Sequence, residues 1–473
     1  MAIAPTGPGM VAEAENAAAD AGAAPEQPWP SEGRGWFALF AIIFATFTMF
    51  FDQTVFGLLA ERIKASFHIS DATLGFLLGP ASVIAFVIVG IPLARLVDIY
   101  PRKWVLSAGI SILGVIMALG GIAQNFAQLI ASRLFVGASV SANGPGSYSM
   151  LVDSFRPLRI PLVFALIQLG YIGGSSLGNI LGGQMVAWTA TLPAKVSVLG
   201  IMTFNWQLVM IIIGGLGVLA GVIMLFVREP PRRSPPEAHR LVPASASFSR
   251  KVLAFLGFDA AVAIWQHRQV FLPLFAALAL SAVESQGLPA WRIPFMKRTY
   301  GWSEAETGAL LGSLQLVAML AGIVAGTLFV QWLGKRHKDA NIRATAVIFA
   351  CTTVCTVLTP LMPNGVLAIT LMSLGVFFGL AGAPAQNAAV QRITPNEKRG
   401  QISAFYLFMF TFFGALGSYV IGAVSTYVVV DESKVWLSIL ITAAIFLPTA
   451  TYLMYRGIRP YREEVMRLEK LGM

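Results

Sequence analysis

The chain has 473 residues, of which 56% are hydrophobic and only 12% carry a charge. That is about half the charge of an ordinary soluble domain, which excludes a protein whose whole surface faces water. The net charge of +10 would suit a nucleic-acid partner, but the placement of the basic residues explains it otherwise.

Apolar runs of about 20 residues, long enough for a helix to cross a ~30 Å hydrocarbon core, recur along nearly the whole chain. Twelve spans are predicted, near residues 36–57, 73–96, 104–123, 126–151, 160–188, 206–228, 270–292, 306–333, 342–361, 365–388, 400–428 and 434–456. The sequence therefore predicts an all-α polytopic membrane protein.

The segments outside the spans differ in composition. Residues 1–33 contain mainly Ala, Gly, Pro and Glu, which predicts a disordered tail, and no cleaved signal peptide is expected because a basic n-region is missing. Residues 229–269 combine a Pro- and Arg-rich linker with a predicted amphipathic helix. The linker separates two six-span units at 34–228 and 270–456, and 457–473 form a second tail.

Lys and Arg concentrate in alternate connections: those after the even-numbered spans and the C-terminus. This asymmetry is the positive-inside pattern, so both termini are expected in the cytoplasm and the protein in the plasma (inner) membrane. Once the basic loops are explained in this way, no signal for nucleic-acid binding remains.

The two six-span units repeat each other. "HISDATLG" matches "GWSEAETG", with Ser70 and Ser303 lying 233 positions apart, and each serine is expected to cap a helix. Ser303 with Glu306 predicts a capping box. At the same offset, Arg102 matches Lys335. Two pseudo-symmetric six-helix bundles are the plan of a secondary transporter with its site between the halves.

The segment "ARLVDIYPRK" resembles the loop between the second and third spans of the major facilitator superfamily. Asp98, Arg102 and Lys103 fit that pattern. In this family the Asp meets the start of the eleventh helix, which here begins near Arg399. The resemblance implies an inner gate made of these four residues, although Arg102 and Lys103 also fit plain topology signals.

The fifth span carries small residues that resemble the antiporter motif of the same superfamily, with an asparagine where proline is usual. We expect these residues to serve close helix packing. They are Gly174, Gly178, Asn179, Gly182 and Gly183.

Within the superfamily, "HISDATLGFLLGP", "RLFVGASVSANGPGSYSMLVDSF" and "KRGQISAFYLF" resemble the spinster branch of lipid transporters. The resemblance implies the major facilitator fold and a lipid-like substrate. Two positions depart from the branch, because Gln53 replaces an arginine and Val140 a glutamate. Both changes remove charge from the expected site and leave coupling and substrate class open.

Three ionisable residues fall well inside predicted spans: Asp52, Arg133 and Glu284. A charge at the bilayer centre costs about 2.5–3.5 kcal/mol on insertion scales, so such residues should face the bundle interior and find partners. We expect Asp52 to pair with Arg133, and the acid to exchange a proton when that cation moves away. A purely structural ion pair is the alternative.

Further candidates would line the substrate path. The seventh span contains glycine and prolines that interrupt its helix, which predicts a gate near an outer mouth. A tryptophan there could equally be an interface anchor. The candidates are Gln53, Asn143, Trp291 and Arg292.

The function predicted from these features is proton-coupled transport of a lipid-like or amphipathic molecule by alternating access. Uptake of an organic acid, received by Arg133 or Arg292, is the second possibility. A membrane enzyme is disfavoured because the four histidines are scattered and no acidic cluster exists. Cys351 and Cys355 are expected to pack, not to bind metal, and no cofactor is expected. The expected partners are a small-molecule substrate, protons and the bilayer, and the expected state is a monomer.

Overall fold

The computed structural model describes residues 29–140, 143–233, 264–394 and 399–470, and these are almost entirely helical. Ten helices are long and apolar enough to cross a membrane, and two shorter apolar helices, Asp71–Phe86 and Phe126–Ser139, lie where the second and fourth spans are expected. The described residues therefore confirm the all-α polytopic fold and are compatible with twelve spans. The expected amphipathic helix and the N-terminal tail fall almost wholly outside them.

The N-terminal half contains nine α-helices in the described chain and one small hairpin that the sequence did not predict. Its elements are α2 (Glu32–Leu58), α3 (Ala60–Phe67), α4 (Asp71–Leu78), α5 (Pro80–Ile99), α6 (Arg102–Gly120), α7 (Phe126–Val140), α8 (Asn143–Ser154), α9 (Ile160–Ala190), β1 (Lys195–Val198), β2 (Ile201–Phe204) and α10 (Gln207–Leu225). Strands β1 and β2 pair antiparallel.

The C-terminal half repeats this plan with longer helices. Its elements are α13 (Arg268–Tyr300), α14 (Glu304–Gly334), α15 (Ala340–Leu358), α16 (Gly365–Arg392), α17 (Arg399–Ala423), a π-helical turn η5 (Val424–Val429), the short turn η6 (Glu432–Lys434) and α18 (Val435–Lys470). Helix α18 runs on past residue 456, through the segment expected to be a tail.

The helix starts that carry the repeat are capped as expected. The Ser70 side chain accepts a hydrogen bond from the backbone N–H of Thr73 at the start of α4. Ser303 and Glu306 form a reciprocal capping box at the start of α14. Both predicted caps are therefore confirmed, at equivalent places in the two halves.

The second span is divided between α4 and α5 at Gly79, where the chain meets α17. A methyl group in place of the Gly79 hydrogen would lie 2.3 Å from the carbonyl oxygen of Ala415. The equivalent methyl at Gly75 would lie 2.3 Å from the carbonyl oxygen of Ser418. Helix α4 of one half thus touches α17 of the other backbone to backbone, because glycine permits this distance.

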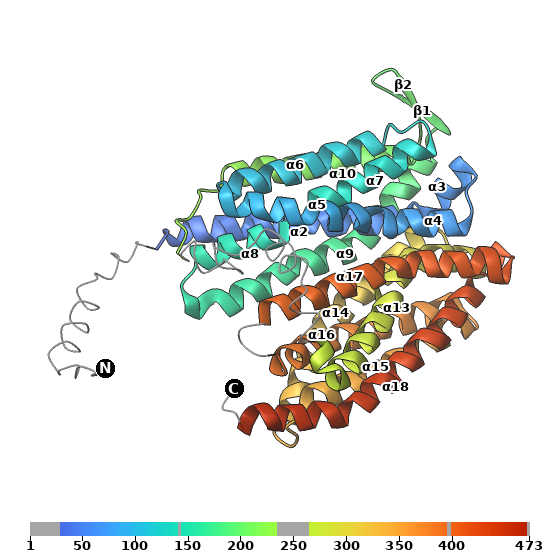
Figure 1. Cartoon of the computed structure of the whole chain (residues 1–473). Coiled ribbons are helices and arrows are strands. Elements are labelled where there is room, and N and C mark those ends of the chain that lie inside the picture. The colour runs from blue at the N-terminus through green and yellow to red at the C-terminus, as the bar shows by residue number, and fades with distance from the viewer. Residues whose placement is uncertain (1–28, 141–142, 234–263, 395–398, 471–473) are drawn as a thin grey trace, which may run out of the picture.

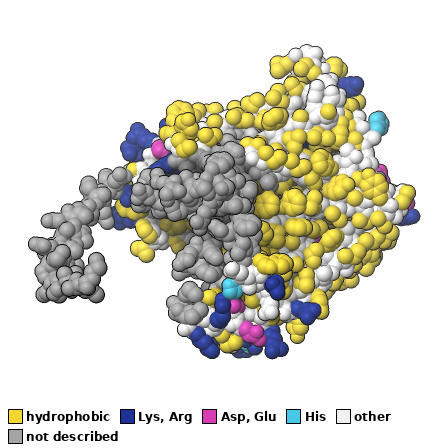
Figure 2. Space-filling view, in the orientation of Figure 1, with side chains coloured by type: hydrophobic (Ala, Val, Ile, Leu, Met, Phe, Trp, Pro, Cys, Tyr) yellow, Lys and Arg dark blue, Asp and Glu magenta, His cyan; other side chains and the backbone are white. Residues whose placement is uncertain are grey.

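The two halves diverge from one end of the molecule toward the other (Figure 1). We call the end that holds the start of α2 and the end of α18 the terminal end, and the opposite end, with α3 and the β1–β2 hairpin, the hairpin end. Hydrophobic side chains cover the flanks between these ends, whereas Lys and Arg gather at the ends themselves (Figure 2). An apolar flank of this kind suits the hydrocarbon core of a bilayer.

Packing inside a half makes one clear prediction about stability. A side chain at Gly114 of α6 would collide with α10, 2.3 Å from the backbone nitrogen of Val218. Gly114→Val should therefore lower the free energy of unfolding by about 1–3 kcal/mol through overpacking. Gly215→Val is the matched control, since nothing lies within 4 Å of that position. Thermal unfolding in detergent measures both variants, and equal melting temperatures would contradict the helix packing described.

Candidate functional site

An ion pair lies within the N-terminal half, between α2 and α7. Arg133 Nη1 donates to Asp52, 3.1 Å from Oδ2 and 3.4 Å from Oδ1. The two residues are only 3% and 6% exposed. The guanidinium carbon lies 3.7 Å from the centroid of the Phe56 ring, so the cation is also stacked on an aromatic face. The structure thus brings together the two residues that the sequence suggested as partners.

The Arg133 guanidinium is only partly used by this pair. Its Nε and Nη2 are buried and have no hydrogen-bond partner in the described part of the chain. A guanidinium carries five N–H donors, and buried donors are normally satisfied. Arg133 therefore has N–H donors that are available to a further acceptor.

Glu284 of α13 is a second buried acid, 2% exposed. Neither of its carboxylate oxygens has a hydrogen-bond partner among the described residues. Thr442 of α18 is close enough to interact, but its hydroxyl donates to two carbonyl groups of its own helix. The acid therefore sits in the C-terminal half without a cation beside it.

The expected substrate-lining residues divide into two groups. Gln53 is exposed near the end of α2, as expected for a residue that faces open space. Ser285 and Gln286 on α13 are also exposed, and the sequence did not single them out. Asn143 is buried instead, with Nδ2 2.7 Å from the sulfur of Met49.

The expectation for Trp291 was wrong. Its side chain is fully buried, and its indole N–H donates to the carbonyl oxygen of Ser418 at 2.9 Å. Trp291 therefore joins α13 to α17 and neither lines an open path nor anchors an interface. The neighbouring Arg292 is also buried, 9% exposed.

The expected inner gate is only partly described. The side chains of Asp98 and Arg399 lie outside the described residues. Arg102 is buried, and its ion pairs stay within the N-terminal half and the linker, with Asp153 at 2.5 Å and Glu229 at 2.9 Å. Within the described chain Arg102 thus joins α6 to α8 and the linker in its own half. This corrects its assignment to a gate between the halves.

Polar contacts at the terminal end also involve Lys103 in the N-terminal half and Asp339 in the C-terminal half. The Lys103 backbone N–H donates to Glu229 at 2.8 Å. In the C-terminal half, burial raises the pKa of Asp339, but hydrogen bonds from Arg343 and Arg462 outweigh it and hold the pKa below its usual range. Each half therefore has ion pairs of its own at this end.

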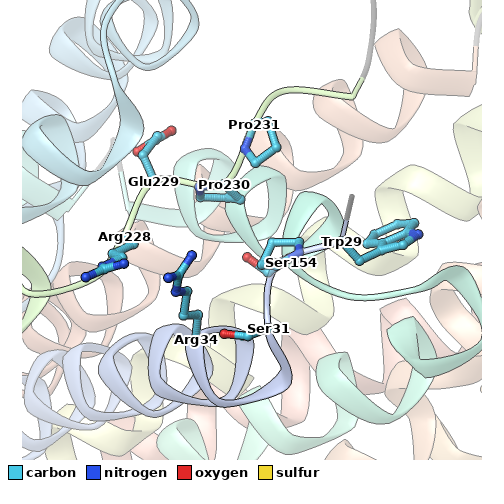
Figure 3. A pocket seen from close by; sticks show the side chains of 10 residues that line it. Trp29, Ser31, Arg34, Ser154, Arg228, Glu229, Pro230 and Pro231 are labelled. Atoms are coloured by element: carbon cyan, nitrogen blue, oxygen red, sulfur yellow. The ribbon is translucent and has the colours of Figure 1, made fainter. Parts of the chain in front are cut away.

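A pocket of about 200 Å³ also opens at the terminal end, where α2 begins beside the linker (Figure 3). Arg34, Arg228 and Glu229 are among the residues that line it. It lies on the order of 27 Å along α2 from Asp52, so it is separate from the central ion pair.

The small residues of α9 pack as expected, and two helices share them. A methyl group at Gly174 would lie 2.5 Å from the Phe47 carbonyl oxygen of α2. On the other side, a methyl group at Gly183 would lie 2.8 Å from the carbonyl oxygen of Glu304 in α14. Asn179 Nδ2 donates across the halves to Gln315 at 3.3 Å.

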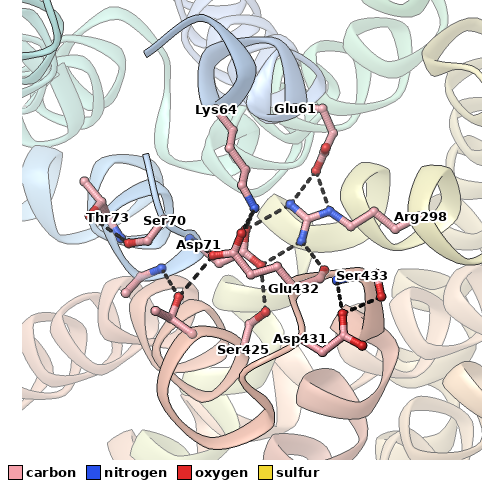
Figure 4. A network of polar contacts seen from close by, with 12 residues as sticks. Glu61, Lys64, Ser70, Asp71, Thr73, Arg298, Ser425, Asp431, Glu432 and Ser433 are labelled. Carbon is pink, nitrogen blue, oxygen red and sulfur yellow. Dashed lines mark hydrogen bonds and ion pairs between the residues drawn. The ribbon is translucent and has the colours of Figure 1, made fainter. Parts of the chain in front are cut away.

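An ion network that the sequence did not predict joins the halves at the hairpin end (Figure 4). Asp71 at its centre is fully buried and accepts hydrogen bonds from Arg298 at 2.7 and 2.9 Å, from Lys64 at 2.6 Å and from Ser425 at 2.6 Å. Arg298 also binds Glu61 at 2.7 Å. We call Glu61, Lys64, Asp71, Arg298 and Glu432 the cross-half network.

The cross-half network closes the hairpin end. Glu432 is the C-terminal partner of Lys64 and also accepts from the Asp71 backbone N–H at 2.8 Å. A further ion pair, Arg62 with Glu304 at 3.7 Å, crosses the halves beside it. A sequence signal existed: several cations stand on the side that is otherwise poor in positive charge, among them Lys64 and Arg298.

The described residues contain no group of three or more His, Cys, Asp or Glu that could hold a metal ion. What they offer is a bundle of two halves, closed at one end by charges from both, with isolated charges at its centre. This arrangement can open and close around a solute.

Comparison with known families decides the identity of the fold. Residues 42–418 match the profile of the Major Facilitator Superfamily. The chain belongs to this superfamily. It is accordingly a multi-pass membrane transporter and not an enzyme.

Members of the superfamily with known names or structures are similar to it over most of its length. An MFS-type efflux pump of Mycolicibacterium smegmatis (strain ATCC 700084 / mc(2)155) is 25% identical over 396 residues, which cover 83% of this chain and 85% of that one. Protein spinster homolog 3 of Danio rerio is 22% identical over 415 residues, covering 84% and 78%. The crystal structure of a bacterial homolog of the human lysosomal transporter Spinster superposes with a TM-score of 0.75 at 19% identity, covering 92% and 99%.

The cross-half network predicts a change in conformational equilibrium. Asp71→Asn removes the charge that holds Arg298 and Lys64, so the hairpin end should open more often. A reporter is Ala290→Cys in a variant with Cys351→Ala and Cys355→Ala, because Ala290 packs against Gly57 behind the network. Labelling by a membrane-impermeant maleimide should become roughly tenfold faster.

The control for this experiment is Asp431→Asn. The Asp431 side chain is 44% exposed and bonds, among the described residues, to its neighbours Ser433 and Lys434, so Asp431→Asn should leave the labelling rate unchanged. If the protein with Asp71→Asn and the protein with the unaltered network were labelled at equal rates, another contact would close this end.

Proposed function

We propose that this superfamily member is a proton-coupled transporter that moves an amphipathic, lipid-like molecule by alternating access. The observation that carries the proposal is the buried Asp52–Arg133 pair with its unused N–H groups. In a purely structural ion pair, all N–H groups of the guanidinium would be expected to have acceptors. An ion pair that also binds substrate needs N–H donors without a protein partner.

The free N–H groups suggest how substrate and proton are linked. Asp52 and Arg133 stand on α2 and α7 of the same half, so rocking of the halves as rigid bodies leaves the pair intact. A substrate acceptor that binds Arg133 competes with Asp52 for the same cation. A carboxylate that loses its cation in apolar surroundings takes up a proton. Binding of substrate would thereby favour protonation of Asp52.

The shape of the bundle supports alternating access. The hairpin end is tied by the cross-half network, while the halves diverge toward the terminal end (Figure 1). The Lys and Arg distribution assigns the terminal end to the cytoplasm. On that assignment the cross-half network would close the outer side, and the halves would diverge toward the cytoplasm, in the plasma (inner) membrane.

The surroundings of Asp52 favour an amphipathic substrate. Phe40, Phe44, Phe47 and Phe51 follow one another along α2 toward Asp52, with ring centroids 5.5–6.3 Å apart. Exposed Gln53 adds a polar group beside the acid.

Asp52→Asn tests the coupling, because asparagine keeps the size of the side chain but cannot carry the proton. NBD-labelled lysophosphatidylethanolamine serves as the amphipathic probe in proteoliposomes with an imposed pH gradient. We expect gradient-driven movement of the probe to fall to the level of protein-free liposomes, with binding of the probe retained.

Glu463→Gln is the control, an exposed acid on α18 that pairs only with Arg459. It should transport as the natural chain does. If Asp52→Asn still responds fully to the gradient, Asp52 is structural and the coupling acid must be sought elsewhere, with Glu284 next.

A further inference from the structure

Arg292 is a buried cation for which the described chain supplies no counter-ion. It lies eight residues before the end of α13, and its buried Nε has no hydrogen-bond partner among the described residues. No ion pair links Arg292 to any described residue. The side chain of Tyr171 in α9 lies near Arg292.

The acids of the described spans are engaged elsewhere or too far away. Asp52 is paired with Arg133, and Asp71 with Arg298 and Lys64. Glu284 lies eight residues before Arg292 on the same helix, about 12 Å along its axis. An arginine buried in a membrane bundle without an anion is costly, and such residues mark substrate or ion pathways.

Tyr171 faces Arg292 from the other half of the molecule. Its ring packs edge-on against Phe50 of α2, with centroids 4.6 Å apart, so the N-terminal half holds it in place. A phenol can donate one hydrogen bond in addition to those of a guanidinium. Arg292 and Tyr171 are therefore hydrogen-bond donors from both halves in the same region of the bundle.

We propose that Arg292, with Tyr171, binds an anionic head group of the transported molecule, a carboxylate or a phosphate. The planar guanidinium suits both groups because it can donate two parallel hydrogen bonds to either. The proposal rests on the transport function above and narrows its substrate to an amphipathic anion. An anion held in this way bridges the two halves.

The test measures equilibrium binding of two probes that differ only in charge: dansyl-undecanoic acid and its methyl ester. Protein in nanodiscs is titrated without a pH gradient, and binding is read as energy transfer to the dansyl group from the ten tryptophans, among them Trp291 next to Arg292. The acid should bind at least roughly tenfold more tightly than the ester, as expected for charge-assisted hydrogen bonds.

Variants assign that preference to the two residues. Arg292→Gln should abolish the difference between acid and ester, Arg292→Lys should keep part of it, and Tyr171→Phe should reduce it a few-fold. Arg456→Gln, which removes an exposed arginine of α18, is the matched control and should keep the full difference. A preference for the acid that survives in Arg292→Gln would overturn the proposal.

Competition separates the possible sources of the anion. Dodecyl phosphate should displace the dansyl acid and inorganic phosphate should not, if the head group belongs to an amphipathic molecule. Displacement by inorganic phosphate at similar concentrations would instead show a site for free anions and overturn the proposal as stated.

Two measurements keep the proposal testable if Arg292→Gln does not fold. The acid should raise the melting temperature of the natural chain more than the ester does, and the Lys variant provides a charge-conserving comparison. Asp52→Asn should keep the preference for the acid while losing gradient-driven flux. Failure of the head-group proposal and failure of proton coupling are therefore distinguishable.

Discussion

The closed hairpin end depends on one buried carboxylate, Asp71, which holds cations from both halves. Its partners Lys64 and Arg298 come from α3 and α13, and each also binds a second acid, Glu432 or Glu61. Breaking a buried ion pair by removing one partner is costly, yet separating the halves lets water rehydrate every charge. For this reason, a closure made of ion pairs can be stable in the closed state and still open without a prohibitive cost in free energy.

The centre of the bundle has the complementary property, an excess of unused donors. Arg133 and Arg292 each keep guanidinium N–H groups without a partner in the described chain, one in each half. Buried donors without acceptors destabilise a protein by about 1–3 kcal/mol each, unless a ligand supplies the acceptor. The free energy gained when a substrate anion binds there is available to draw the halves together, which links occupancy of the centre to movement of the ends.

How much of this structure the sequence predicts depends on how far apart in the chain the interacting residues lie. Spans, caps and packing glycines follow from local patterns, so Ser303 and Gly174 behave as expected. Asp52 and Arg133 could be matched because very few charges lie within spans. Asp71 and Arg298, 227 positions apart, stand among many loop charges, and nothing local selects that pairing. Trp291 was misplaced for a related reason, since only the approach of α17 shows that its indole is buried.

The central claim is that the two ends open in alternation, and paired spin labels measure it most directly. One pair, Leu199→Cys with Leu361→Cys, spans the hairpin end, and the other, Leu158→Cys with His337→Cys, spans the terminal end; all four positions are exposed. Electron–electron distances would be compared with and without an amphipathic anion, in a background lacking Cys351 and Cys355. The account predicts a short hairpin-end distance without ligand, and opposite changes at the two ends when the equilibrium shifts. Distances that lengthen or shorten together would contradict it.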